Sequence, residues 1–135
     1  MFFCLTIPGR VWGQQYIGKH KSEVRRLMKE DWKELYEDDS SRNPVYNMVK
    51  YVDRLNSQTL IYFFSKQDTC IYSKWMCDYS MLNKAICDLN EKYKQSAENT
   101  WHYTHENRTY RITLTTGDWF FTIITKPDEK ELDQD

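Results

Sequence analysis

The spacing of apolar residues along the chain changes several times, and each change predicts a different kind of element. Residues 2–7 and 11–17 are rich in strand-forming residues and flank Pro8-Gly9, which predicts an N-terminal hairpin. From Ser22, a good N-cap, apolar residues recur at the helical period. They predict a first helix that ends before Ser40, because the acidic residues 37–39 oppose the helix dipole.

The middle of the chain mixes helical and strand-like patterns. Asn43-Pro44 is a helix-start signal, and Val45, Met48, Val49 and Val52 follow at helical spacing, so we expect a second helix that ends near Asn56. Residues 59–64 form a nearly continuous apolar run, typical of a central strand, with which residues 69–72 are expected to pair. A third helix is expected from Asp78 or Ser80 to about Gln95.

Beyond this third helix the apolar pattern has a period of two. It predicts antiparallel strands over residues 101–104, 110–115 and 119–125, the last two joined in a tight hairpin at Gly117-Asp118. Large apolar groups fall on both faces of this hairpin, so we expect one face to join the core and the other to form an interface. Trp119, Phe121 and Ile123 share one of these faces, and Phe120 and Ile124 share the other.

Together these elements predict one α+β domain over residues 1–126. Its parts would be a small mixed or antiparallel sheet, the N-terminal hairpin, three helices and the C-terminal antiparallel β-hairpin. A chain of 135 residues with 40% hydrophobic residues is long enough for one compact core and too short for two ordinary domains. Residues 127–135 are acidic and lack core residues, which predicts a disordered tail.

Charge and hydropathy limit the classes of partner. The formal net charge is −1, so no strong nonspecific attraction to a polyanion is expected, and phosphate binding would need a local patch. No apolar run is long enough for a membrane span, and the N-terminus lacks the features of a secretory signal. We therefore expect a cytoplasmic protein, in the host cytoplasm if it is viral, with no membrane partner.

The cysteines and histidines do not predict a metal site. Four cysteines occur at irregular spacings without a Cys-x-x-Cys pair, which predicts buried free thiols rather than a zinc site or a disulfide framework. His102 and His105 fall in a probable strand, where this spacing places them on opposite faces. No metal and no cofactor are expected from these residues.

Two groups of residues are candidates for binding. The first is a cationic patch around the start of the first helix, made of Lys19, His20, Lys21, Arg25 and Arg26, which could contact a few phosphates of a nucleic acid. The second consists of tryptophans, which are favoured at protein interfaces and are too many for the core of so small a domain. Trp12, Trp101 and Trp119 are the predicted interface residues.

The spelling Tyr16-Ile17-Gly18, followed by a basic helix, resembles the second half of the signature of the GIY-YIG nucleases, and the predicted element order over residues 2–94 is similar to theirs. In that family an arginine lies eight residues beyond the glycine, and Arg26 occupies this position. The resemblance implies metal-assisted phosphodiester hydrolysis, in which Tyr16 helps to activate water, Arg26 stabilises charge on the phosphate and a later glutamate holds a divalent cation such as Mg²⁺.

The sequence departs from that family at two positions. Phe3-Cys4-Leu5 contains no tyrosine where the first half of the signature belongs, and Ala85-Ile86-Cys87 stands where the metal-holding glutamate is expected. Without these groups hydrolysis should be slower by orders of magnitude. The sequence therefore predicts a noncatalytic binding or inhibitory module that engages a protein or nucleic acid. Its small size and the resemblance suggest a viral or mobile-element factor.

Two enzymatic alternatives remain open at this point. One is an active metal-dependent endonuclease in which Glu91, Tyr72 or Glu106 replaces a missing group. The other is a metal-independent ribonuclease that uses Tyr16, His20 and Arg26, since these side-chain types can support RNA transphosphorylation. The C-terminal strands are expected either to extend the sheet or to offer an edge through which a homodimer forms.

Overall fold

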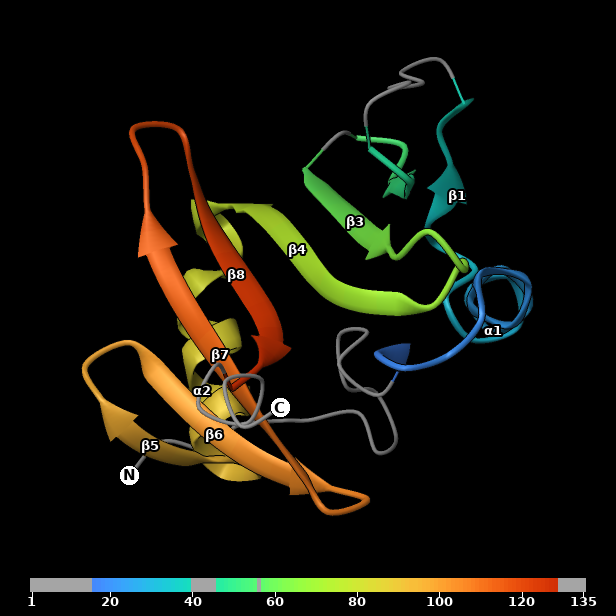
Figure 1. Cartoon of the computed structure of the whole chain (residues 1–135). Coiled ribbons are helices and arrows are strands. Elements are labelled where there is room, and N and C mark those ends of the chain that lie inside the picture. Colours follow the sequence, from blue (N-terminus) through green and yellow to red (C-terminus); the bar gives the residue numbers. More distant parts are fainter. Residues whose placement is uncertain (1–15, 40–45, 56, 129–135) are drawn as a thin grey trace.

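The computed structural model describes residues 16–39, 46–55 and 57–128. In these ranges the chain forms a single antiparallel sheet in the order β1-β2-β3-β4-β8-β7-β6-β5, with two α-helices and a short 3₁₀ turn, Tyr79–Met81 (Figure 1). The helices are α1 (Lys21–Asp31) and α2 (Leu82–Lys92). The strands are β1 (Tyr36–Glu37), β2 (Met48–Val52), β3 (Gln58–Phe64), β4 (Cys70–Asp78), β5 (Lys94–Ala97), β6 (Thr100–His105), β7 (Arg108–Thr116) and β8 (Phe120–Pro127).

The expectation of three helices beside a small sheet is wrong. The segment predicted as the second helix contains strand β2, which pairs with β3 through contacts such as Val49 opposite Tyr62. Its apolar residues match a helical stripe, but Val49, Tyr51 and Val52 are types that favour strands, and all three are buried. The segment forms a strand because its backbone groups pair with those of β3 in an antiparallel ladder.

Several other predictions are confirmed. Both α1 and α2 are helices, as predicted. The predicted bounds of α1 are wrong, because it ends at Asp31 and its N-cap is His20 rather than Ser22. His20 Nδ1 accepts a hydrogen bond from the Ser22 backbone N–H at 3.1 Å. β3 and the three C-terminal strands lie where they were predicted, and β7 and β8 form the hairpin across Gly117-Asp118. β4 is longer than expected, and the short strands β1 and β5 were not anticipated.

Some predictions fall outside the described residues. These are almost all of the N-terminal hairpin, Phe3-Cys4-Leu5, Asn43-Pro44 and the last seven residues of the tail. At the tail's predicted start, Pro127 ends β8, and the Asp128 backbone N–H donates to the Thr109 carbonyl at 3.0 Å. The chain therefore stays attached to the sheet up to residue 128. No helix in the described ranges is both long enough and apolar enough to cross a membrane.

Both helices cover the same face of the sheet. The Tyr62 hydroxyl donates to Met28 Sδ of α1 at 3.5 Å, and Trp101 Nε1 donates to Asn90 Oδ1 in the last turn of α2 at 2.8 Å. Tyr62 and Trp101 belong to one row of buried residues that are paired from strand to strand across five strands. The row consists of Tyr62, Ser73, Thr125, Ile112 and Trp101. Paired residues share a face of a sheet, so the core lies between this face and the two helices.

The turn before α1 fixes how that helix meets the sheet. Gly18 has a φ of +95°, in the region that favours glycine, and its backbone N–H donates to the Cys70 carbonyl at 2.8 Å. Tyr16 and Ile17, just before this glycine, are buried. The turn therefore connects a buried aromatic residue to the exposed basic start of α1, the two parts of the site predicted from the sequence.

Candidate functional site

Tyr16 lies in the core rather than at an open site. Its side chain is 1% exposed, and its ring packs on that of Tyr62 with centroids 5.8 Å apart. Its hydroxyl donates a long hydrogen bond to Asp31 Oδ2 at 3.4 Å. A hydroxyl in this position stabilises the packing of α1 and has little access to the water that a hydrolase must activate.

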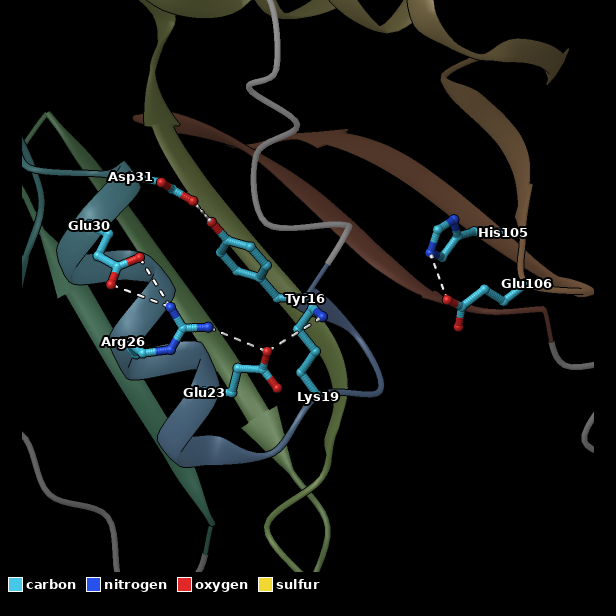
Figure 2. Close-up of polar contacts among 8 residues, drawn as sticks. All are labelled: Tyr16, Lys19, Glu23, Arg26, Glu30, Asp31, His105 and Glu106. Atoms are coloured by element: carbon cyan, nitrogen blue, oxygen red, sulfur yellow. Dashed lines mark hydrogen bonds and ion pairs between the residues drawn. The ribbon is translucent and has the colours of Figure 1, made fainter.

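Arg26 lies on the exposed side of α1, where two carboxylates hold its guanidinium. Its nitrogens lie 3.1 Å from Glu30 Oε2 and 3.6 Å from Glu23 Oε1. Figure 2 shows the guanidinium between these two acids, whereas the Tyr16 hydroxyl is directed at Asp31. Tyr16 and Arg26 are thus close along the chain, but their functional groups have different partners and different exposure.

The other members of the predicted cationic patch also have partners within the protein. Lys19 pairs with Glu23 at 3.9 Å, and Lys21 Nζ donates to Asn47 Oδ1 at 2.6 Å. Arg25 donates two hydrogen bonds to the Glu37 carboxylate, at 3.0 and 3.2 Å, and these raise the pKa of Arg25. The glutamate carboxylates next to Lys19 and Arg25 reduce the attraction of these two cations for phosphate.

His20, the fifth member of that patch, caps α1. Its Nδ1 lies 3.0 Å from the Ser22 hydroxyl as well as accepting from the Ser22 N–H. A ring nitrogen used in this way has a structural role at the helix terminus. The capping function could have been anticipated from the position of His20 just before the helix, although Ser22 was the predicted cap.

The groups proposed to replace missing nuclease residues do not gather around Tyr16. Tyr72 stacks on Phe63, with ring centroids 4.3 Å apart, and Glu106 pairs with His105 at 3.7 Å in the β6–β7 turn (Figure 2). Glu91 is exposed near the end of α2. Among the described residues no group of three or more histidines, cysteines, aspartates or glutamates is arranged to hold a metal ion.

The predicted interface tryptophans have different environments. Trp12 lies outside the described residues. Trp101 is 1% exposed and is bonded to Asn90, so the prediction that it forms an interface is wrong. Trp119 is 84% exposed at the β7–β8 turn, and its place at an interface stays a prediction.

Trp119 borders a pocket of about 300 Å³ that lies at the ends of three neighbouring central strands, where β4 ends and β3 and β8 begin. We call this pocket and its rim the Trp119 surface. Its walls come from the start of β3, the end of β4 and the start of β8: Ser57, Gln58, Thr59, Met76, Cys77, Asp78, Trp119 and Phe120. Sequence reasoning identified the aromatic side of this surface and missed the β3 and β4 side, because only strand pairing brings these segments together.

The chemistry of this pocket suits binding. The Asp78 carboxylate accepts a hydrogen bond from the Ser80 backbone N–H at 3.0 Å, and hydrogen bonds with Ser80 lower the pKa of Asp78, so it is charged at neutral pH. Cys77 is buried, and burial raises the pKa of its thiol, which makes it a poor nucleophile. The pocket therefore offers apolar walls, a rim carboxylate and amide and hydroxyl groups.

The cysteines only partly follow the prediction. Cys70 and Cys77 are free and buried, as expected, whereas Cys87 is disulfide-bonded. The prediction of free thiols is therefore wrong for Cys87. Cys4 lies outside the described residues.

Comparisons of the chain with family models, with curated proteins and with solved structures found no match. The predicted second helix, which contributed to the resemblance to GIY-YIG nucleases, contains a strand. That resemblance now depends on the spelling Tyr16-Ile17-Gly18 and on the position of Arg26.

Proposed function

We propose that this chain is a noncatalytic binding protein that takes up a peptide segment of a partner protein at the Trp119 surface. The observation that carries the proposal is the 84% exposure of Trp119 beside a pocket of about 300 Å³. Trp32, Trp75 and Trp101 are all buried, so the fold is able to cover tryptophan side chains.

An exposed indole next to a concave site has a physical reason to bind. Covering a large apolar side chain releases water from its surface, and tryptophans at pocket edges carry much of the binding energy at protein interfaces. Phe120 and Tyr79 are also partly exposed near the same turn, where the Tyr79 hydroxyl donates a hydrogen bond to the Gly117 carbonyl. This bond ties the turn to the segment after β4 and keeps the aromatic residues in place.

The charge on the rim indicates what the pocket accepts. Asp78 is a charged carboxylate among the pocket residues, so a peptide with a basic group beside an apolar side chain is complementary to it. The apolar side chain would contact Met76, Trp119 and Phe120, and the basic group would pair with Asp78.

Two features support a noncatalytic role. The Tyr16 hydroxyl is buried against Asp31, and Arg26 already has two acidic neighbours, so neither group is available to a phosphodiester in the way that hydrolysis requires. In the pocket itself, burial and the neighbouring Asp78 carboxylate raise the pKa of the Cys77 thiol, which keeps it in the unreactive protonated form.

A random peptide library displayed on phage tests the proposed function. The wild-type chain should enrich peptides with an apolar side chain next to lysine or arginine, and Trp119→Ala should lose this enrichment. Leu55→Ala is the matched control, because Leu55 is 87% exposed and is not among the residues that line the pocket. Equal enrichment by wild type and Trp119→Ala, or none by either, would contradict the proposal.

Incubation with plasmid DNA and with RNA tests the noncatalytic part separately. With Mg²⁺ or Mn²⁺, and again in EDTA, neither substrate should be cleaved above the background of an Arg26→Ala variant. Metal-dependent nicking that this variant lacks, or RNA cleavage that requires His20, would show that the chain is an enzyme.

A further inference from the structure

The sequence contains one acceptor signal for N-linked glycosylation, Asn107-Arg108-Thr109. The signal consists of an asparagine, any residue except proline, and a serine or threonine two positions after the asparagine. None of the other asparagines of the chain has a serine or threonine at that position. Such a short signal also arises by chance, so its place in the fold decides whether it is usable.

Asn107 lies at the tip of the β6–β7 hairpin. His105 is paired with Arg108, so Glu106 and Asn107 form the turn between the strands, and their φ values are +52° and +65°. Asparagine adopts positive φ angles more easily than most residues, which explains its place in this turn. In Figure 1 this turn is the loop at the lower right that joins β6 to β7.

The Asn107 side chain is open to solvent. Every residue from Thr104 to Arg108 is exposed. Glu106, the other residue of the turn, is paired with His105 at 3.7 Å (Figure 2). Within the described part of the chain, the Asn107 side chain has no hydrogen bond or ion pair of its own. Its amide nitrogen is therefore accessible to a modifying enzyme, and a bulky group on this nitrogen would extend into solvent.

A second turn shows which part of the signal the turn geometry does not explain. Asn99 lies between β5 and β6 with a φ of +55°, so both asparagines have the left-handed conformation that tight turns require. Two positions after Asn99 the chain has Trp101, whose indole is buried, whereas two positions after Asn107 it has Thr109. Turn geometry explains both asparagines, and the acceptor signal is present only at the second.

The state of Cys87 bears on the compartment in which the chain matures. Cys87 is disulfide-bonded, whereas Cys70 and Cys77 are free and buried. Disulfides form and persist in oxidising compartments and are rare in the cytosol, where thiols are kept reduced. The disulfide of Cys87 therefore favours a secretory route over the cytoplasmic location expected from the sequence, and N-linked glycans belong to secreted proteins.

We propose that Asn107 carries an N-linked glycan on a chain that matures in the secretory pathway. The co-reactant is an oligosaccharide joined to a lipid through a pyrophosphate. Asn107 Nδ2 attacks the anomeric carbon of the first sugar and forms a C–N bond. The C–O bond to the pyrophosphate breaks, and the lipid pyrophosphate leaves with the bonding electron pair. The amide loses one proton to the solvent, and no oxidant or reductant is consumed.

The glycan lies far from the Trp119 surface. β7 begins at Arg108, next to Asn107, and ends at Thr116, near the turn that contains Trp119. A strand of nine residues spans about 30 Å, so the two turns are at opposite ends of β7. Glycosylation of Asn107 leaves the Trp119 surface accessible, and it holds or fails independently of the proposed function.

Expression of the full chain behind a cleavable secretion leader in insect cells tests this proposal. Digestion with a peptide-N-glycosidase should increase the gel mobility of the secreted wild-type chain. This enzyme converts a glycosylated asparagine into aspartate, so mass spectrometry of the digested chain should find aspartate at position 107. A wild-type chain that is secreted without a glycan on Asn107 would overturn the proposal.

Substitutions separate the acceptor signal from the geometry of the turn. Asn107→Gly should remove the glycan completely, while glycine keeps the positive φ of the turn. Asn99→Gly is the matched control, because it makes the same change in the β5–β6 turn, and it should leave the glycan in place. Thr109→Val should also abolish the modification, whereas Thr109→Ser should retain it. A glycan that persists in Asn107→Gly or in Thr109→Val would contradict the assignment of this site.

Alkylation tests the secretory route separately. The secreted chain, unfolded in urea without a reductant and treated with iodoacetamide, should be labelled at Cys70 and Cys77 and unlabelled at Cys87. Labelling of Cys87 to the same extent as the other two would show that it is a free thiol, and it would overturn the proposed maturation in an oxidising compartment.

Discussion

Trp101 Nε1 donates a hydrogen bond to Asn90 Oδ1 across 2.8 Å, and this contact joins the outer strands of the sheet to α2. Trp101 is 1% exposed, so its indole fills the space between β6 and the helix while its polar nitrogen remains bonded. Trp101, one of the three tryptophans predicted from the sequence to lie at an interface, is therefore part of the core.

Trp101→Phe should lower the free energy of unfolding by about 1–3 kcal/mol, because it removes this hydrogen bond and leaves space where the larger ring was. Urea denaturation measures the loss. Trp119→Phe is the control and should change stability by less than about 0.5 kcal/mol, since its side chain is exposed. A double-mutant cycle with Asn90→Ala should give a coupling of about 1 kcal/mol, and no coupling would mean that the bond is not formed in solution.

The exposure of Trp119 predicts its fluorescence. Acrylamide should quench the fluorescence of Trp119 more efficiently than the fluorescence of the buried Trp32, Trp75 and Trp101, because a collisional quencher reaches only accessible indoles. Trp119→Phe should therefore shift the emission maximum of the protein to shorter wavelength and lower the quenching constant. If quenching were the same in the variant and the wild type, Trp119 would be covered in solution, for example by a second copy of the chain.

Cys70 and Cys77 should resist alkylation in the folded protein. Both are buried, and burial raises the pKa of the Cys70 thiol to about 12, so its reactive thiolate is scarce at pH 8. Iodoacetamide followed by peptide mass spectrometry should find these residues unmodified in native protein and modified in urea. Rapid native labelling of either cysteine would mean that the β4 region opens readily.

Asp53 should make the free energy of unfolding decrease as the pH falls into the acidic range. Burial opposes its ionisation, but hydrogen bonds from Ser57 and Gln58 outweigh burial and hold the pKa of Asp53 below its ordinary value. A carboxyl group whose pKa is lower in the folded state stabilises the fold above its unfolded pKa of about 3.9, and this contribution is lost as the pH falls through the folded pKa.

The corresponding test is Asp53→Asn. It should cost about 1 kcal/mol at neutral pH, a value kept small because solvent reaches this loop, and the difference from wild type should shrink toward pH 3. Urea denaturation at both pH values measures it. A difference that stayed constant with pH would show that the ionised carboxylate is not what stabilises the β2–β3 connection.

Local patterns were sufficient for several elements. The apolar residues of α2 recur at helical spacing, and this pattern correctly predicted the helix. In β7 and β8, apolar and polar residues alternate on either side of Gly117, which correctly predicted a hairpin. The helix predicted for the segment with Val49 and Val52 is wrong, because the spacing of these apolar residues fits a short helix and a strand equally. Pairing with β3 decides in favour of the strand.

The predicted site shows the same division between local and tertiary information. Tyr16 and the basic residues of α1 are neighbours in the sequence, which suggested a shared surface, yet the tertiary structure buries the Tyr16 ring and pairs Arg26 with Glu23 and Glu30. Glu23 and Glu30 stand three residues before and four residues after Arg26, and this spacing on a helix predicts the two ion pairs from the sequence alone.

The sequence by itself determined which segments have an intrinsic period, where the tight turns fall and that Trp119 sits beside one of them. Only the tertiary structure decided that Trp101 is covered and that Trp119 borders a pocket. The physical reason is that periodicity and turn chemistry act between near neighbours in the chain. Strand register and burial depend on segments far apart in sequence, which come together only when the whole sheet forms.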